Sequence, residues 1–177
     1  MLVNAACPDA QERQQFAVLV IAIFQRWYKR IDRTQFALLK ALTNELEMPA
    51  AMGGLVKEFA QGTASSEWGQ LGGKRIAIYS PQDSALRRAA LVISELSPGI
   101  RVDTFDDHVG GSPALRKAAT TADIFILATA AAKHAATTFI EDRRPKNLVT
   151  LYARGQGSTS LLEALREYAG QASPPNS

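Results

Sequence analysis

From residue 74 onward, short strand-like segments alternate with longer helix-like segments. The strand-like segments are rich in β-branched and aromatic residues and lie at 75–79, 100–105, 123–129 and 147–152. The helix-like segments follow them at 84–96, 113–120, 130–140 and 160–168. Four such units in a row need crossover connections between parallel strands. The pattern therefore predicts an α/β fold with a small doubly wound parallel sheet of four strands in the order 2-1-3-4.

The first 61 residues have a different pattern, which predicts an N-terminal helical hairpin or triplet. Two residue pairs have the spacing of a capping box, Asp9 with Glu12 and Asp32 with Gln35. The first helix is expected to end near Ile31, the second stops before Pro49, and residues 55–59 form a shorter third helix. Turn-forming residues mark 62–73 as a linker to the α/β domain at 74–170, and 171–177 is expected to be a disordered tail.

The first helix contains an uninterrupted apolar run of nine residues from Phe16 to Phe24. This run has roughly half of the ~20 residues needed to cross a bilayer, so we expect no membrane span. A lone surface helix would not be apolar on nearly every side, so this helix must be covered by the α/β domain, by a second copy of the chain or by another protein. Of these three covers, we favour self-association. We expect a homo-oligomer or a larger complex, with an interface made by Phe16, Leu19, Val20, Ile23, Phe24 and Trp27.

Charge and cysteine content narrow the classes of function. The chain has 20 basic and 17 acidic residues, and they are scattered, so nucleic-acid binding is not favoured. The single cysteine, Cys7, forms neither an internal disulfide nor a cysteine-based zinc site, which fits a reducing, cytoplasmic location.

A ligand site is expected where the strands end at their carboxyl side, because open parallel sheets bind ligands at that edge. The loops after the first, third and fourth strands meet there. Their candidate ligand-binding residues are Ser80, Gln82, Thr129, Lys133, His134, Arg154, Gly155, Gly157, Ser158 and Ser160.

The loop after the fourth strand is the best candidate for binding an anion. Gly155 and Gly157 let backbone amides approach a ligand ahead of a helix N-terminus, and Arg154 adds a positive charge. The competing interpretation is an ordinary strand-to-helix loop in which Ser160 and Glu163 form a capping box. The loop lacks the lysine of a Walker loop and does not follow the first strand as a dinucleotide fingerprint does, so nucleotide hydrolysis is disfavoured. No cofactor is assigned, and a nucleotide or other phosphate is the candidate ligand.

Two further groups of residues have side chains suited to chemistry. His134 is the one candidate acid or base, but no nucleophile accompanies it. Asp106, Asp107 and His108 have side chains that can bind a divalent metal, yet turn and capping roles explain them better, so no metal site is predicted.

Three segments together resemble the bacterial domain of unknown function 2325 over residues 73–169. They are the strand at 122–129, the helix start with His134, and the stretch from Leu151 to Leu165. The resemblance implies a small Rossmann-like domain. It also implies that Arg154, Ser158, Ser160 and His134 are the residues to test, without naming a reaction.

The sequence supports three functional hypotheses. The first is a non-catalytic subunit for oligomerisation or partner docking in a bacterial complex, with a small anion or nucleotide at the strand ends. The second is an enzyme acting on a nucleotide or phosphorylated substrate, with His134 as its catalytic residue. The third is a nucleic-acid-binding accessory subunit whose basic patch would combine Arg143, Arg144, Lys146, Lys133 and Arg154, although a solvated helix end explains the run at 141–146 equally well.

Overall fold

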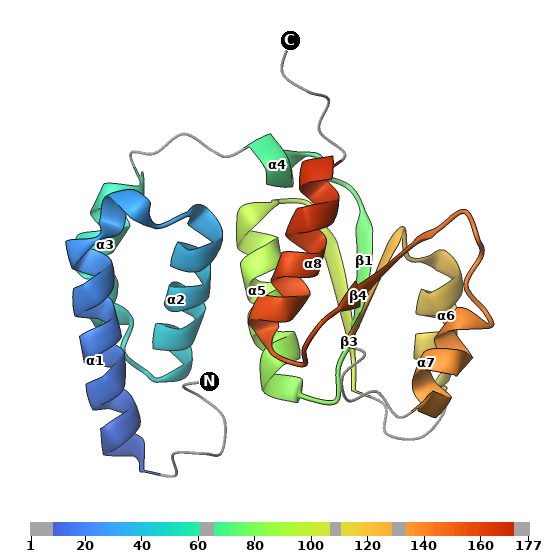
Figure 1. Ribbon diagram of the computed structural model, residues 1–177, viewed down its shortest axis with the longest axis horizontal. Helices are drawn as coiled ribbons and strands as arrows, with labels where there is room; N and C mark the ends of the chain where they lie inside the picture. Colours follow the sequence, from blue (N-terminus) through green and yellow to red (C-terminus); the bar gives the residue numbers. More distant parts are fainter. Residues whose placement is uncertain (1–8, 61–65, 107–110, 129–133, 172–177) are drawn as a thin grey trace. The chain divides into compact units, whose positions relative to one another are not determined.

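The computed structural model describes residues 9–60, 66–106, 111–128 and 134–171 (Figure 1). These residues form two compact units, Met1–Ser65 and Ser66–Ser177. The first unit is helical, and the second contains the sheet. No helix of the described residues is both long and apolar enough to cross a membrane.

The second unit is an α/β domain with a four-stranded parallel sheet. The strands are β1 (Arg75–Tyr79), β2 (Arg101–Phe105), β3 (Ile124–Ala128) and β4 (Val149–Ala153). Their order is β2-β1-β3-β4, and all three neighbouring pairs are parallel. The predicted fold class and strand order are therefore confirmed.

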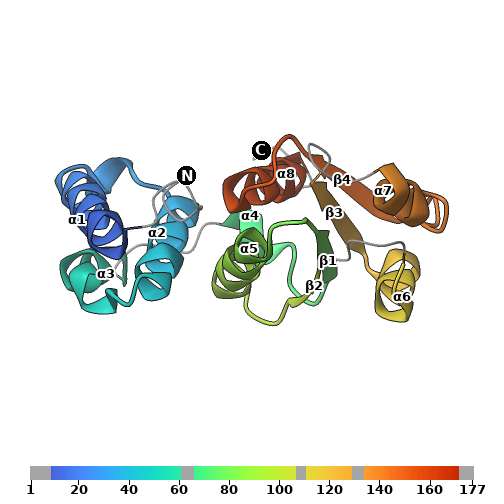
Figure 2. The ribbon, with the colours of Figure 1, turned by 90° about the horizontal axis from the view of Figure 1, so that it is seen from below.

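Helices cover both faces of this sheet. They are α5 (Asp83–Leu96), α6 (Pro113–Thr121), α7 (His134–Glu141) and α8 (Ser158–Gln171), with a short α4 (Ser66–Gly69) before β1. α5 and α8 lie together on one face, and α6 and α7 lie on the other (Figure 2). Right-handed crossovers from strand to strand place successive helices on opposite faces wherever the strand order changes direction.

The core beneath α6 and α7 is built from alternate residues of the strands. Ala77 and Tyr79 of β1 and Phe125 and Leu127 of β3 are buried there against α6 and α7. The intervening Ile76, Ile78, Ile124 and Ile126 are equally buried on the other face. Consecutive residues of these strands are all apolar because helices cover both faces of the sheet.

A local signal sets the start of α6, whereas the start of α8 differs from the one expected from sequence. Ser112 caps α6 by accepting a hydrogen bond from Leu115 N, and Pro113 takes the first helical position. The capping box predicted at Ser160 is wrong, because α8 begins two residues earlier, at Ser158. The Leu161 amide already donates to Gly157 O, so Ser160 lies inside the first turn.

Residues 66–73, the described part of the expected linker, belong to the second unit. α4 and the following turn bury Trp68 and Leu71. α8 continues through Gln171, and the rest of the predicted tail, 172–177, lies outside the described residues.

The first unit contains α1 (Ala10–Arg26), α2 (Arg33–Glu45) and α3 (Gly53–Ala60), joined by the 3₁₀ turns η1 (Tyr28–Arg30) and η2 (Pro49–Met52). The expected triplet is thus present. Asp32 and Gln35 form the predicted reciprocal capping box, and Asp9 caps α1. α1 ends at Arg26, earlier than expected, because the chain tightens into η1.

Only one side of α1 contributes to the core of this unit. Ile21 packs with Leu39 of α2, Met52 of η2 and Leu55 of α3, and the partly buried Val20, Phe24 and Tyr28 extend this cluster. Ala17 is buried on the same side.

Candidate functional site

The loops after β1 and β4 are joined by hydrogen bonds at the carboxyl ends of the strands. The hydroxyl of the buried Ser80 donates to Gln156 O over 3.2 Å and accepts from Gln82 N over 3.3 Å. Gln82 Nε2 donates to Gln156 Oε1 over 3.0 Å. Two of the predicted ligand-binding side chains, Ser80 and Gln82, therefore bind a neighbouring loop of the same chain.

The loop that precedes α8 is tightly packed at its first glycine. A Cβ on Gly155 would lie 2.7 Å from Ser160 Oγ, whereas a Cβ on Gly157 would meet nothing within 4 Å. Ser158 is buried as the first residue of α8. The Ser160 hydroxyl thus fills the space that Gly155 leaves open.

Arg154 and Ser160 line a small polar hollow whose other walls include two acidic side chains. The hollow has a volume of about 30 Å³, and its other lining residues are Tyr152, Glu163, Ala164 and Glu167. That volume suits about one water molecule. Two carboxylates beside Arg154 also make the hollow unfavourable for an anion. This geometry favours a solvent site over a nucleotide site.

The other predicted site residues lie at the limits of the described structure. Thr129, Lys133, Asp107 and His108 are outside the described residues. His134 is the first residue of α7, and only its backbone is described. Within the described ranges, no group of three or more His, Cys, Asp or Glu residues is arranged to hold a metal ion. The anion-binding and enzymatic hypotheses stay predictions.

Arg144 is buried. It therefore cannot contribute to the basic surface patch expected from sequence. Its burial also shows that the run 141–146 is not wholly exposed to solvent. Its guanidinium donates to Ala119 O over 3.1 Å, to Asp123 O over 3.2 Å and to Val149 O. Burial lowers the pKa of Arg144, and the negative charge of Asp123 opposes that shift. Arg143 and Lys146 stay exposed on either side of it.

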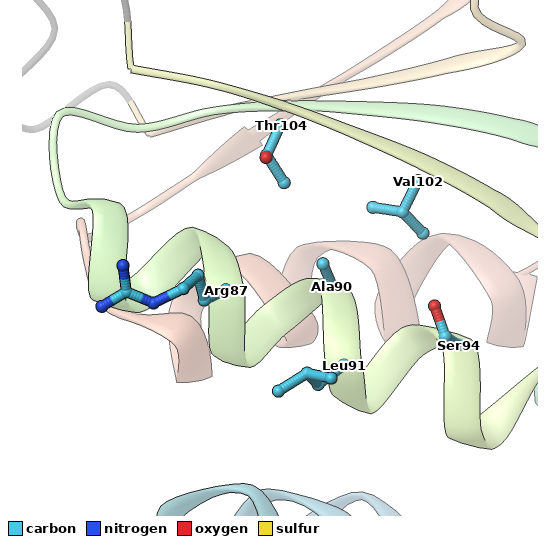
Figure 3. Close-up of a pocket in the computed structure, with 6 residues that line it drawn as sticks. All are labelled: Arg87, Ala90, Leu91, Ser94, Val102 and Thr104. Atoms are coloured by element: carbon cyan, nitrogen blue, oxygen red, sulfur yellow. The ribbon is translucent and has the colours of Figure 1, made fainter. Parts of the chain in front are cut away.

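A groove runs between α5 and the edge strand β2 (Figure 3). It has a volume of about 350 Å³ and is lined by Arg87, Ala90, Leu91, Ser94, Val102 and Thr104. Sequence reasoning did not find it. The small side chains of Ala90 and Ser94, which lie on α5 opposite β2, are the signal that could have indicated it.

The exposed side of α1, together with its C-cap residue Trp27, carries four large apolar side chains, which we call the α1 stripe. They are Phe16, Leu19, Ile23 and Trp27, with exposed fractions of 48%, 63%, 59% and 46%. At about 100° of rotation per residue, they fall within an arc of about 80°. The stripe contains four of the six predicted interface residues, and the other two, Val20 and Phe24, are partly buried in the core of the unit.

The C-terminal end of the α1 stripe is surrounded by positive charge. The guanidinium carbons of Arg30 and Arg26 lie 4.8 Å and 5.8 Å from the ring centroid of Trp27. Lys29 lies over the neighbouring Tyr28 ring at 5.9 Å. Cation–π contacts of this kind hold the indole at the surface.

Comparison with known proteins identifies the family. A family model described as DpdD-like matches residues 1–164. The chain belongs to the DpdD-like family. No curated protein and no solved structure shows significant similarity to it.

The DpdD-like match overturns the resemblance to the domain of unknown function 2325, which is a different family. The features behind that resemblance are a buried strand followed by a glycine- and serine-rich loop and a helix. Any parallel α/β sheet needs such connections, so they are shared by unrelated families. The DpdD-like match also includes the helical first unit, which the resemblance left out.

Proposed function

We propose that this member of the DpdD-like family is an assembly subunit that docks through the α1 stripe. Membership in the family suggests a bacterial protein associated with DNA modification. The observation that carries the proposal is the stripe of four exposed apolar side chains on the face of α1 that does not pack on α2, η2 or α3.

Exposure of the α1 stripe to water is unfavourable, and covering it would lower the free energy of the protein. Complete burial of a large apolar side chain contributes about 1.5–3 kcal/mol relative to full exposure. The stripe side chains are about half exposed, so each has on the order of 1 kcal/mol still to gain. Trp, with its large rigid ring, is enriched in the energetic centres of protein interfaces. Four such side chains on one helix are typical of a helix that packs against another protein.

The experiment compares the molar mass of the full chain over a range of concentrations with that of Leu19→Glu. Light scattering coupled to gel filtration should show a mass above that of one chain for the native sequence and a mass of one chain for Leu19→Glu. A charge placed in the middle of a dry apolar contact carries a desolvation penalty that the assembly cannot offset.

Val18→Glu is the matched control. Val18 is as exposed as the stripe, at 52%, and lies next to Leu19 in sequence. Its position on the helix is about 140° from the centre of the stripe. Val18→Glu should therefore assemble like the native chain. The proposal fails if native chain and Leu19→Glu have the same mass at every concentration.

A second candidate function, nucleic-acid binding, is favoured by the basic residues around Trp27. Arg26, Lys29, Arg30 and Arg33 are all exposed, and Arg30 stacks on the indole. Basic side chains beside an exposed aromatic ring are typical of sites that bind single-stranded nucleic acid. This cluster differs from the basic patch predicted from sequence, which included the buried Arg144.

Filter binding to single-stranded DNA at several salt concentrations tests this candidate. Binding through the cluster should weaken steeply with salt, and Lys29→Glu combined with Arg30→Glu should abolish it. Arg143→Glu with Lys146→Glu is the matched control, because it reverses two exposed charges in the other unit. Equal binding by the two double variants would rule the Trp27 cluster out.

A further inference from the structure

One acidic and one basic residue of α1, Glu12 in its first turn and Arg26 in its last, lie on a line through its most exposed large apolar residue, Leu19. Glu12, Leu19 and Arg26 follow one another at steps of seven residues. Seven residues are nearly two helical turns, so the three side chains lie on almost one line, with a drift of about 20° per step. Leu19, the most exposed member of the α1 stripe, is midway between the acid and the base.

We propose that the chain forms a homodimer in which the two α1 helices pack antiparallel about a two-fold axis near Leu19. This inference rests on the assembly role proposed above and names the partner of the α1 stripe as a second copy of the chain. A two-fold interface uses the same surface on both chains, so that surface must complement itself.

The antiparallel arrangement makes the α1 stripe complementary to itself. An axis at Leu19 places Leu19 of the two copies together and brings Phe16 beside Ile23 of the other copy. It also places Glu12 opposite Arg26 of the second copy, about 10 Å from the axis on each side. Glu12 in the first turn and Arg26 in the last turn of α1 then alternate across the interface, and the helix dipoles are opposed.

A parallel pair in the same register lacks this complementarity. It would place Glu12 beside Glu12 and Arg26 beside Arg26, and both like-charge contacts are repulsive. The aligned helix dipoles would add to the repulsion. Charge therefore selects the antiparallel arrangement, while the apolar side chains supply most of the affinity.

Charge reversal tests the pairing. Glu12→Arg and Arg26→Glu each convert two attractive contacts of the symmetric dimer into repulsive ones, so each should weaken dimerisation by roughly tenfold at low salt. The double variant Glu12→Arg/Arg26→Glu restores opposite charges across the interface and should recover the native dissociation constant. Analytical ultracentrifugation measures all four constants, and circular dichroism checks that α1 stays helical.

Cross-linking tests the direction of the helices in the full chain with Cys7→Ser. A short thiol cross-linker should join two copies of Leu19→Cys, and it should join Glu12→Cys to Arg26→Cys in a mixture. It should not join Glu12→Cys to itself, because the two positions are about 21 Å apart along the axis of an antiparallel pair. Val18→Cys, which lies away from the α1 stripe, is the negative control.

The outcomes separate this inference from the assembly role. If Leu19→Glu does not change the mass, the docking role of the α1 stripe falls, and the dimer falls with it. If Leu19→Glu dissociates the assembly but Glu12→Cys cross-links to itself, or the double charge reversal fails to recover affinity, only the antiparallel dimer is overturned. A native chain that is monomeric at every concentration has the same mass as Leu19→Glu, so that outcome overturns both the docking role and the dimer.

Discussion

Nε of Arg144 donates a hydrogen bond to Oγ1 of Thr150 over 2.8 Å, which joins the segment after α7 to β4. The same guanidinium lies 5.5 Å from the ring centroid of Phe125 on β3 and supplies donors to three main-chain oxygens. One side chain thus connects α6, β3 and β4 at the amino ends of the strands.

Arg144→Met should lower the free energy of unfolding by about 3 kcal/mol, because buried main-chain oxygens lose their donors. Arg144→Lys should cost about 2 kcal/mol, because an ammonium keeps the charge but cannot reach the same acceptors at once. Urea denaturation measures both. Lys146→Met, an exposed neighbour, should change stability by about 0.5 kcal/mol or less. A native-like midpoint for Arg144→Lys would contradict the structural role.

Gly111 is required for steric reasons as well as for its backbone angle. Its φ is 73°, and a Cβ there would lie 2.2 Å from two ring carbons of Phe139. Gly73 has a similar φ of 75°, but a Cβ there would meet nothing within 4 Å. Gly73→Ala should therefore cost about 1 kcal/mol, and Gly111→Ala about 3 kcal/mol.

The difference between the two glycine variants isolates the steric contribution of Phe139. Thermal or urea unfolding measures the loss of stability in each variant, and subtracting the two losses gives this contribution. In a Phe139→Leu background, the cost of Gly111→Ala should fall toward that of Gly73→Ala. Equal costs for the two variants in the native background would show that Phe139 moves aside freely.

Tyr152 should titrate above the ordinary tyrosine range. Partial burial raises its pKa from 10.0, and a hydrogen bond of 2.9 Å to Glu141, together with the charge of that carboxylate, raises it further. The folded state therefore favours the protonated phenol. The stabilisation that Tyr152 gains from this environment is complete below pH 10.0, and it is lost as the pH rises through the higher pKa of the folded state.

Tyr152→Phe should cost on the order of 0.5 kcal/mol near neutral pH, because the side chain is half exposed and the hydrogen bond competes with water. The cost should vanish at alkaline pH. Difference absorbance of the native chain against Tyr152→Phe measures the pKa of this phenol alone. Glu141→Gln should move that pKa down toward 10.0, and a pKa that does not move would exclude Glu141 as a cause.

Much of the second unit follows from local sequence. The alternation of apolar strand segments with helical ones leads to crossovers. Right-handed crossovers that cover both faces of the sheet require the strand order to change direction, as it does in β2-β1-β3-β4. The caps at Asp32 in the first unit and at Ser112 in the second depend on residues within three positions, so the sequence specifies them directly. The sequence does not fix the start of α8, because Ser158 and Ser160 both suit the first turn of a helix.

The sequence by itself determined the architecture and the existence of an apolar first helix, because both depend on periodicity along a few adjacent residues. Only the tertiary structure decided which side of α1 faces outward, that Arg144 is buried, and that Ser80 binds Gln156. Each of these depends on partners brought together by packing, such as Gln156 for Ser80, which is 76 residues away. Residue type shows that a side chain can donate or be buried, but the fold selects the atoms that it meets.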